Sequence, residues 1–160
     1  MQLTTRFISL FFITLILTLI SSPTFAGHAH HASASKAQIT WHDWSDQTFA
    51  LAASENKLIL LDVSAQWCQF CKKMKAVTYQ DPEVVKIIND NYIAIFADIE
   101  ATPVVGKRYA QLGVPGTVIL TADKKELNKR RGYIAPQQMQ WHLLGNLQDA
   151  SMETASKDKH

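Results

Sequence analysis

The sequence predicts an α/β domain with a mixed central β-sheet flanked by helices. Helical and strand patterns alternate along the chain in the order αβα, αβα and ββα. Alternation of this kind favours parallel strands, and the last two strand patterns are close enough to form an antiparallel hairpin. In addition, the two cysteines, Cys68 and Cys71, stand where an apolar strand pattern gives way to a helical one.

The first helix and strand are marked by a cap and an apolar run. Ser45 or Asp43 is expected to cap a helix that runs to about Ser54. Residues 57–65 form the apolar run expected of a buried central strand. The next helix is expected from Cys68 to about residue 77.

The middle of the chain repeats the same order. Asp81-Pro82 predicts a helix start, and the helical pattern ends near Asn91. Residues 92–99 are expected as a strand, and Thr102-Pro103 begins another helix, for which Gly113 is the expected stop.

The end of the domain is predicted as a hairpin followed by a helix. Residues 117–121 and 127–131 are the expected strands, joined by a turn at residues 122–125. Pro136 begins the last helix, and its expected buried stripe consists of Met139, Leu143, Leu144 and Leu147.

The N-terminus has the pattern of a secretory signal peptide, expected at residues 1–26. Arg6 gives a short positive region, and residues 7–20 are apolar but too short for a comfortable membrane span. Ala26 provides a small residue for cleavage before Gly27. We therefore expect a periplasmic protein without a membrane anchor after cleavage; an uncleaved anchor is the alternative.

The mature chain is expected to hold one domain, at residues 40–148, between two polar ends. Residues 27–39 are predicted to be a flexible lead-in, and residues 149–160 a frayed polar tail. Copper or nickel binding is an alternative function for the lead-in, through His28, His30 and His31. After cleavage none of these histidines would be third in the chain, so the familiar amino-terminal copper motif is not met.

Charge and composition exclude some partners. The chain has 16 Lys and Arg against 14 Asp and Glu, a formal net charge of +2, and no basic block. Nothing in it indicates a nucleic-acid partner. We expect a monomer.

The spacing of Cys68 and Cys71 favours redox chemistry. A cysteine at a helix N-terminus lies over free backbone N–H groups, which stabilise its thiolate, and the second cysteine is one turn away and can attack it. A structural disulfide this short would contribute only about 2 kcal/mol or less. A zinc site would need a second pair of ligands, and no second Cys-x-x-Cys exists.

Residues 61–72 resemble the signature of the thioredoxin superfamily, in which a strand with an Asp leads to Ala-x-Trp-Cys-x-x-Cys-Lys. The resemblance extends from about Thr40 to Leu147. Residues 78–84 and Gly132-Tyr133 are similar to exported thioredoxin-like domains such as the C-terminal periplasmic domain of the thiol:disulfide interchange protein DsbD. The resemblance to the thioredoxin superfamily implies a thioredoxin fold.

The resemblance also implies roles for three residues. Cys68 matches the exposed nucleophile, and Cys71 matches the resolving thiol of a redox-active disulfide. Asp62 matches a buried carboxylate that takes and returns the proton of Cys71; the alternative is a solvated, inert carboxylate. No bound cofactor is implied, because the cysteine pair carries the electrons.

Four further residues are expected to contact substrate. Trp67 is expected to shield the site, with a purely core role as the alternative, and Phe70 to offer an apolar contact. Val114-Pro115 resembles the pre-proline and cis-proline of the family. Here the sequence departs from the usual Pro-Thr, because Gly116 intervenes. A shifted register, with Thr117 or Val118 in the loop, is the alternative.

The direction of the reaction is predicted to be reducing. Gln69 and Phe70 add no positive charge between the cysteines, and Lys72, Lys73 and Lys75 are expected to form a solvated face. The expected substrates are disulfide-containing exported proteins, and the expected electron donor is a membrane protein of the DsbD type. The alternatives are an oxidase or isomerase, a copper-binding protein that uses the cysteines and the lead-in, and an interaction module with vestigial cysteines.

Overall fold

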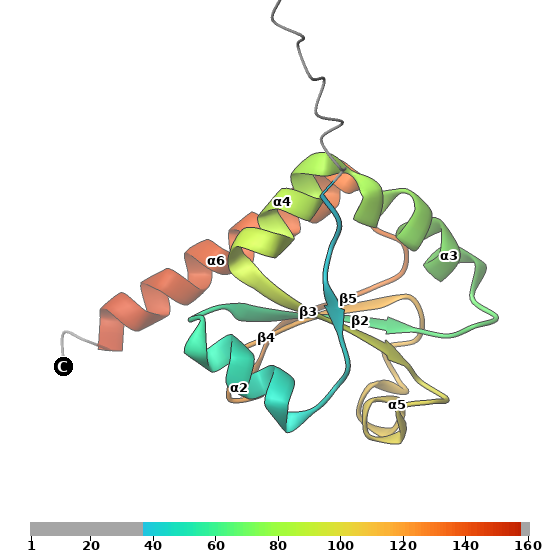
Figure 1. Cartoon of the computed structure of the whole chain (residues 1–160), viewed down its shortest axis with the longest axis horizontal. Coiled ribbons are helices and arrows are strands. Elements are labelled where there is room, and N and C mark those ends of the chain that lie inside the picture. Colours follow the sequence, from blue (N-terminus) through green and yellow to red (C-terminus); the bar gives the residue numbers. More distant parts are fainter. Residues whose placement is uncertain (1–36, 158–160) are drawn as a thin grey trace, which may run out of the picture. The chain divides into compact units, whose positions relative to one another are not determined.

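A computed structural model describes residues 37–157 of the chain. In this part of the chain five strands form one mixed sheet, with the order β1-β3-β2-β4-β5 (Figure 1). β1, β3 and β2 are parallel, whereas β4 is antiparallel to both β2 and β5. The strands are β1 (Trp41–His42), β2 (Leu58–Ser64), β3 (Tyr92–Asp98), β4 (Gly116–Leu120) and β5 (Glu126–Arg131). The predicted mixed α/β sheet is confirmed.

Helices cover both faces of the sheet. Helices α3, α4 and α6 lie on one side in Figure 1, and α2 and α5 lie on the other. Their bounds are α2 (Asp46–Ser54), α3 (Gln69–Ala76), α4 (Pro82–Asn91), α5 (Pro103–Tyr109) and α6 (Pro136–Lys157), and a 3₁₀ helix, η1 (Thr78–Gln80), follows α3.

The pleat of β2 divides the core into two parts. Ile59, Leu61 and Val63 face α2 and α5, whereas Leu60 packs with α3, α4 and α6. Because successive side chains of a strand alternate between faces, Asp62 projects on the same side as Leu60. A carboxyl group is thus placed in an apolar layer, directly before the strand ends.

The helix starts follow the predicted caps. Ser45 Oγ accepts a hydrogen bond from the Thr48 N–H at 3.2 Å. Asp81 Oδ1 accepts from the N–H groups of Glu83 and Val84, each at 3.1 Å. These side chains satisfy donors that a helix N-terminus leaves free.

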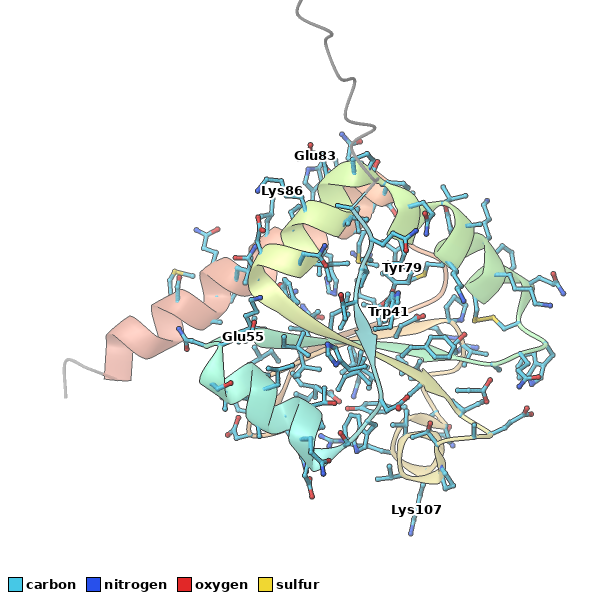
Figure 2. The ribbon with its side chains drawn as sticks, in the orientation of Figure 1. Trp41, Glu55, Tyr79, Glu83, Lys86 and Lys107 are labelled. Carbon is cyan, nitrogen blue, oxygen red and sulfur yellow. A yellow bond between two sulfur atoms is a disulfide. The ribbon has the colours of Figure 1, made fainter. Side chains whose placement is uncertain are left out.

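Two short elements were not predicted. β1 pairs with β3 through only two residues, and η1 has three residues. They are joined by their side chains, since Trp41 and Tyr79 meet edge to face with ring centroids 4.9 Å apart (Figure 2). Neither element is long enough to show a periodic pattern in the sequence.

The last two helices differ from prediction. Leu144 was expected in the buried stripe of α6, but its side chain is 49% exposed. Helical spacing from Met139 and Leu143 instead buries His142 and Asn146. Helix α6 continues through residues 149–157, part of the segment predicted to be a frayed tail; these residues contain neither Gly nor Pro. Helix α5 ends at Tyr109, before the predicted stop.

Gly106 allows α5 to approach the loop after β3. A Cβ atom at Gly106 would lie 2.4 Å from the backbone oxygen of Ile99. We therefore expect Gly106→Ala to lower the free energy of unfolding by about 1–3 kcal/mol, because a backbone atom must move. Gly145→Ala in α6 is the matched control, since a Cβ there meets nothing within 4 Å. Urea unfolding compares the two variants, and equal stabilities would contradict the close approach.

Three predictions about the N-terminus lie outside the described residues: the signal peptide at residues 1–26, its cleavage, and the histidines His28, His30 and His31. Within residues 37–157, no helix combines the length and apolar character that crossing a membrane requires.

Candidate active site

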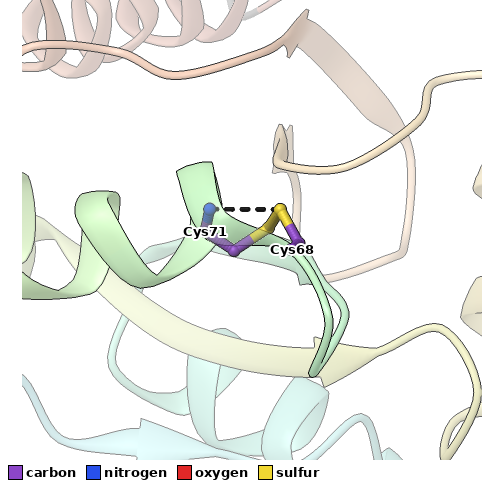
Figure 3. The surroundings of a disulfide bond; sticks show 2 residues. All are labelled: Cys68 and Cys71. Carbon is purple, nitrogen blue, oxygen red and sulfur yellow. Dashed lines mark hydrogen bonds between the residues drawn. A yellow bond between two sulfur atoms is a disulfide. The ribbon is translucent and has the colours of Figure 1, made fainter.

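Cys68 and Cys71 form a disulfide at the start of α3, with Cα atoms 5.3 Å apart (Figure 3). Cys68 is the N-cap residue, and its Sγ accepts a hydrogen bond from the Cys71 N–H at 3.1 Å. The first turn of α3 has no acidic side chain. Free N–H groups at this end of a helix favour a thiolate over a thiol. The predicted placement of the pair at a strand-to-helix junction is confirmed.

The disulfide is largely covered. Cys68 is 5% and Cys71 6% exposed. Ala65 packs beside them, and Ile99 and Val114 cover the cluster from two loops. The expected exposure of Cys68 is therefore wrong for this disulfide form, because neighbouring apolar side chains surround the sulfur.

Two aromatic side chains stand at the rim of the site. Trp67 is 61% and Phe70 60% exposed, although both are large and apolar. The purely core role for Trp67 is thus wrong. Its Nε1–H donates a hydrogen bond to Glu100 Oε1 at 3.1 Å, which orients the indole.

The loop that carries Glu100 is itself fixed. Asp98 Oδ1 accepts hydrogen bonds from the N–H groups of Glu100 and Ala101, at 2.9 and 3.2 Å. The Ile99 N–H donates to the Ser64 carbonyl oxygen at 2.9 Å. Sequence reasoning missed Ile99 and Glu100; the Asp that closes a strand before a turn was the available signal.

The Val114–Pro115 peptide bond is cis, as the resemblance implied. β4 begins at Gly116, and Thr117 pairs with Asp62 inside the sheet. The alternative register, with Thr117 or Val118 in the loop, is therefore wrong. A Cβ at Gly116 would lie 2.8 Å from Leu112 Cδ2 and 3.0 Å from the Gly113 oxygen, so the inserted residue fits this position as glycine.

Asp62 projects from β2 into the apolar layer between the sheet and helices α3, α4 and α6. It is 5% exposed, so the solvated-carboxylate alternative is wrong. Burial raises the pKa of Asp62 to about 7, against the weaker opposing effects of the Tyr79 hydroxyl and the Lys75 ammonium group. A carboxyl group with this pKa exchanges its proton near neutral pH.

No role at Asp62 was predicted from the sequence for either Tyr79 or Lys75. Tyr79 is 3% exposed and reaches Asp62 from η1. Lys75 was predicted to be part of a solvated face, and its side chain is exposed but close enough to act on Asp62.

The described residues contain no group of three His, Cys, Asp or Glu side chains arranged to hold a metal ion. Both sulfur atoms are bonded to each other. The chemistry that this arrangement supports is therefore the opening and closing of the Cys68–Cys71 disulfide.

A protein-family profile described as "Thioredox_DsbH: Protein of unknown function, DUF255" matches residues 21–148. The chain belongs to this family. Its fold and its Cys-x-x-Cys disulfide are thioredoxin-like, and the thioredoxin resemblance found in the sequence is confirmed.

Parts of longer proteins are also similar to this chain. The chain is 32% identical over 88 residues to spermatogenesis-associated protein 20 of Rattus norvegicus, which covers 55% of the chain and 10% of that protein. It is 31% identical over 86 residues to the thiol:disulfide interchange protein DsbD of Cronobacter sakazakii, covering 51% of the chain and 15% of DsbD. The matches thus span a small part of these longer relatives.

Solved structures agree on the fold. A thioredoxin from Thermus thermophilus superimposes with a TM-score of 0.60 at 17% identity, covering 68% of this chain and 86% of that one. A structure titled "DsbH Oxidoreductase" gives a TM-score of 0.53 at 18% identity, covering 61% and 78%. At these identities the comparisons show that this chain shares the thioredoxin fold, and nothing further.

Proposed function

We propose that this protein is a periplasmic thiol:disulfide oxidoreductase that reduces disulfides of exported proteins. The observation that carries the proposal is the Cys68–Cys71 disulfide at the N-terminus of α3, with the buried Asp62 on the strand that leads into it. A structural crosslink of this length would add little stability and would not require a buried carboxyl group on the preceding strand.

The reaction begins with the dithiol form. The Cys68 thiolate attacks one sulfur of a substrate disulfide, so that a mixed disulfide forms and a substrate thiolate leaves. Asp62 then accepts the proton of the Cys71 thiol. The Cys71 thiolate attacks Cys68 Sγ, closes the enzyme disulfide and releases the second substrate thiolate. Two electrons pass to the substrate.

The dithiol must be regenerated by a donor of two electrons. A membrane dithiol protein of the DsbD type fits this need in the periplasm, an oxidising compartment. The identity of part of the chain to DsbD supports this choice, and so does the signal-like pattern of residues 1–26. No bound cofactor takes part.

The reducing direction is favoured because the two residues between the cysteines add no positive charge beside the thiolate. Gln69 and Phe70 are uncharged, and Lys73 and Lys75 lie in the last turn of α3, away from Cys68. A strong oxidase stabilises its reduced form much further, which makes its disulfide unstable.

The rim of the site is suited to protein substrates. Trp67 and Phe70 expose large apolar surfaces on either side of Cys68 in the sequence. Val114 covers the cysteines from the opposite loop. We propose that substrate backbone lies against Val114-Pro115 and that apolar substrate side chains contact the two aromatic rings.

The test is a pair of opposite assays on the chain from Gly27 onward. In the presence of dithiothreitol we expect it to accelerate reduction of the insulin disulfides, and Cys68→Ser to be inactive. With reduced ribonuclease and glutathione disulfide we expect little acceleration of disulfide formation. Strong oxidation of ribonuclease together with slow insulin reduction would contradict the reducing direction.

A further inference from the structure

A cavity of about 190 Å³ reaches Asp62 from the side of the edge strand β1. Its aromatic wall consists of Trp41, Tyr79 and Phe96. The Trp41 ring is edge to face with Tyr79, with centroids 4.9 Å apart (Figure 2). It is also edge to face with Phe96, with centroids 6.4 Å apart. Packed aromatic side chains from β1, β3 and η1 therefore surround the buried carboxyl group at this cavity.

Several buried polar atoms near this cavity lack a hydrogen bond of good geometry, although the Tyr79 hydroxyl is close enough to Asp62 to lower its pKa. Within the described residues, no hydrogen bond of good geometry is made by Asp62 Oδ1, Tyr79 Oη or Thr117 Oγ1. Buried polar groups in proteins are nearly always paired with protein or with ordered water. A cavity of this volume has room for ordered water, and the oxygen atoms of Asp62 and Tyr79 on its wall would be hydrogen-bond partners for it. The cavity thus gives Asp62 a way to meet water without exposing it.

Lys75 brings a charge to the cavity. It is one of the lining residues, and its Nζ lies 6.0 Å from the centre of the Phe96 ring. A cation over an aromatic face is held there by the ring quadrupole. The ammonium group thus lies over the Phe96 ring at the cavity that Asp62 lines, and its charge lowers the pKa of Asp62.

Two further titratable side chains line the cavity with Asp62, Lys75 and Tyr79. β1 and the residue after it contribute His42 and Asp43 to the lining. β4 contributes Thr117 and β3 contributes Phe96, which are both uncharged. Among the described residues that line this cavity, Lys75 is the only lysine or arginine.

We propose that Lys75 and Tyr79 are positioning residues for Asp62, acting through this cavity: Lys75 by its charge and Tyr79 by its hydroxyl group. The inference rests on the proposed function in one respect, since Asp62 is there the acceptor of the Cys71 proton. Both groups favour the ionised carboxylate, so they lower the pKa of Asp62 against the rise that burial causes. They keep Asp62 able to give up its proton near neutral pH, where an unassisted buried acid would retain it.

The experiment is a carbon-13 NMR titration of the Asp62 carboxyl group in the disulfide form of the protein. We expect Lys75→Gln to raise the pKa of Asp62 by about 0.5 unit or more, because an opposite charge is removed. Lys75→Arg should restore it. Tyr79→Phe, which keeps the ring and its packing, should also raise it.

Lys73→Gln is the matched control. It removes the same charge from the same helix, but Lys73 Nζ lies 4.5 Å from the centre of the Tyr133 ring instead of at the cavity. We expect it to move the pKa of Asp62 by less than half as much as Lys75→Gln. Equal shifts for the two lysine variants, or no shift for Lys75→Gln, would overturn the inference.

The titration needs no turnover, so it separates the inference from the proposed function. A protein that fails to reduce insulin but shows the expected shifts would overturn the reductase and leave the positioning roles standing. An active reductase without the shifts would do the reverse. In active protein, the pH profile for resolution of the mixed disulfide should shift to higher pH in Lys75→Gln. It should return to the wild-type profile in Lys75→Arg.

Discussion

Cys71→Ser is expected to turn the protein into a trap for its substrates. Cys68 can still attack a substrate disulfide, but a serine hydroxyl cannot displace the substrate from Cys68. Mixed disulfides should therefore accumulate, and multiple turnover should stop. They are measured by non-reducing electrophoresis and mass spectrometry after mixing the reduced variant with an oxidised protein.

The order of the two cysteines is tested by the converse variant. Cys68→Ser should trap little, because Cys71 lacks the N-cap position that stabilises the thiolate. The double variant is the background control. Equal trapping through Cys71 in Cys68→Ser would contradict the assignment of Cys68 as the nucleophile.

Asp62→Asn is expected to change both stability and rate. The pKa of Asp62 lies at about 7 in the folded protein, against an ordinary value of 3.8. The folded state therefore binds its proton more tightly than the unfolded state does. Stability attributable to this proton is complete below about pH 3.8 and is lost as the pH rises to about 7.

At about 1.4 kcal/mol for each pKa unit, this loss is on the order of 4 kcal/mol. Asp62→Asn should remove most of it, so the variant should be more stable than the wild-type protein at pH 8 and close to it at pH 4. Urea unfolding of the disulfide forms at both pH values measures the effect. Parallel pH dependence in the two proteins would show that Asp62 is not the group responsible.

The same substitution removes the proton acceptor of the resolving step. General-base catalysis typically contributes about 10²–10⁴-fold. We expect resolution of the mixed disulfide to slow by about 10²-fold or more at pH 7 in Asp62→Asn. Quenched-flow measurement of substrate release gives the rate, and a change of less than threefold would contradict the role of Asp62.

Most of the site could be predicted because its signals are local in sequence. Cys68, Cys71 and Asp62 lie within ten residues on one strand and one helix. The strand-to-helix junction therefore places the two cysteines before any tertiary contact is known, whereas the role of Asp62 came from the resemblance. The cis Val114–Pro115 bond was also predicted, but its place beside the cysteines came from the resemblance and not from spacing.

What could not be predicted depends on contacts between distant segments. The Trp67–Glu100 hydrogen bond joins residues 33 apart, and Tyr79 reaches Asp62 from η1, where its ring packs against Trp41 of β1. The error at Leu144 has another cause. Its position is apolar but lies off the helical stripe, and only the periodicity, not the residue type, decides which face is buried.

The most direct test of the proposed reducing function is the equilibrium reduction potential of the Cys68–Cys71 pair in the mature protein, measured against glutathione or dithiothreitol buffers. The proposal predicts a value near that of thioredoxin, about −270 mV, at which the dithiol readily passes electrons to substrate disulfides. A value near about −120 mV, like that of a strong periplasmic oxidase, would contradict it and make disulfide formation the function of the pair.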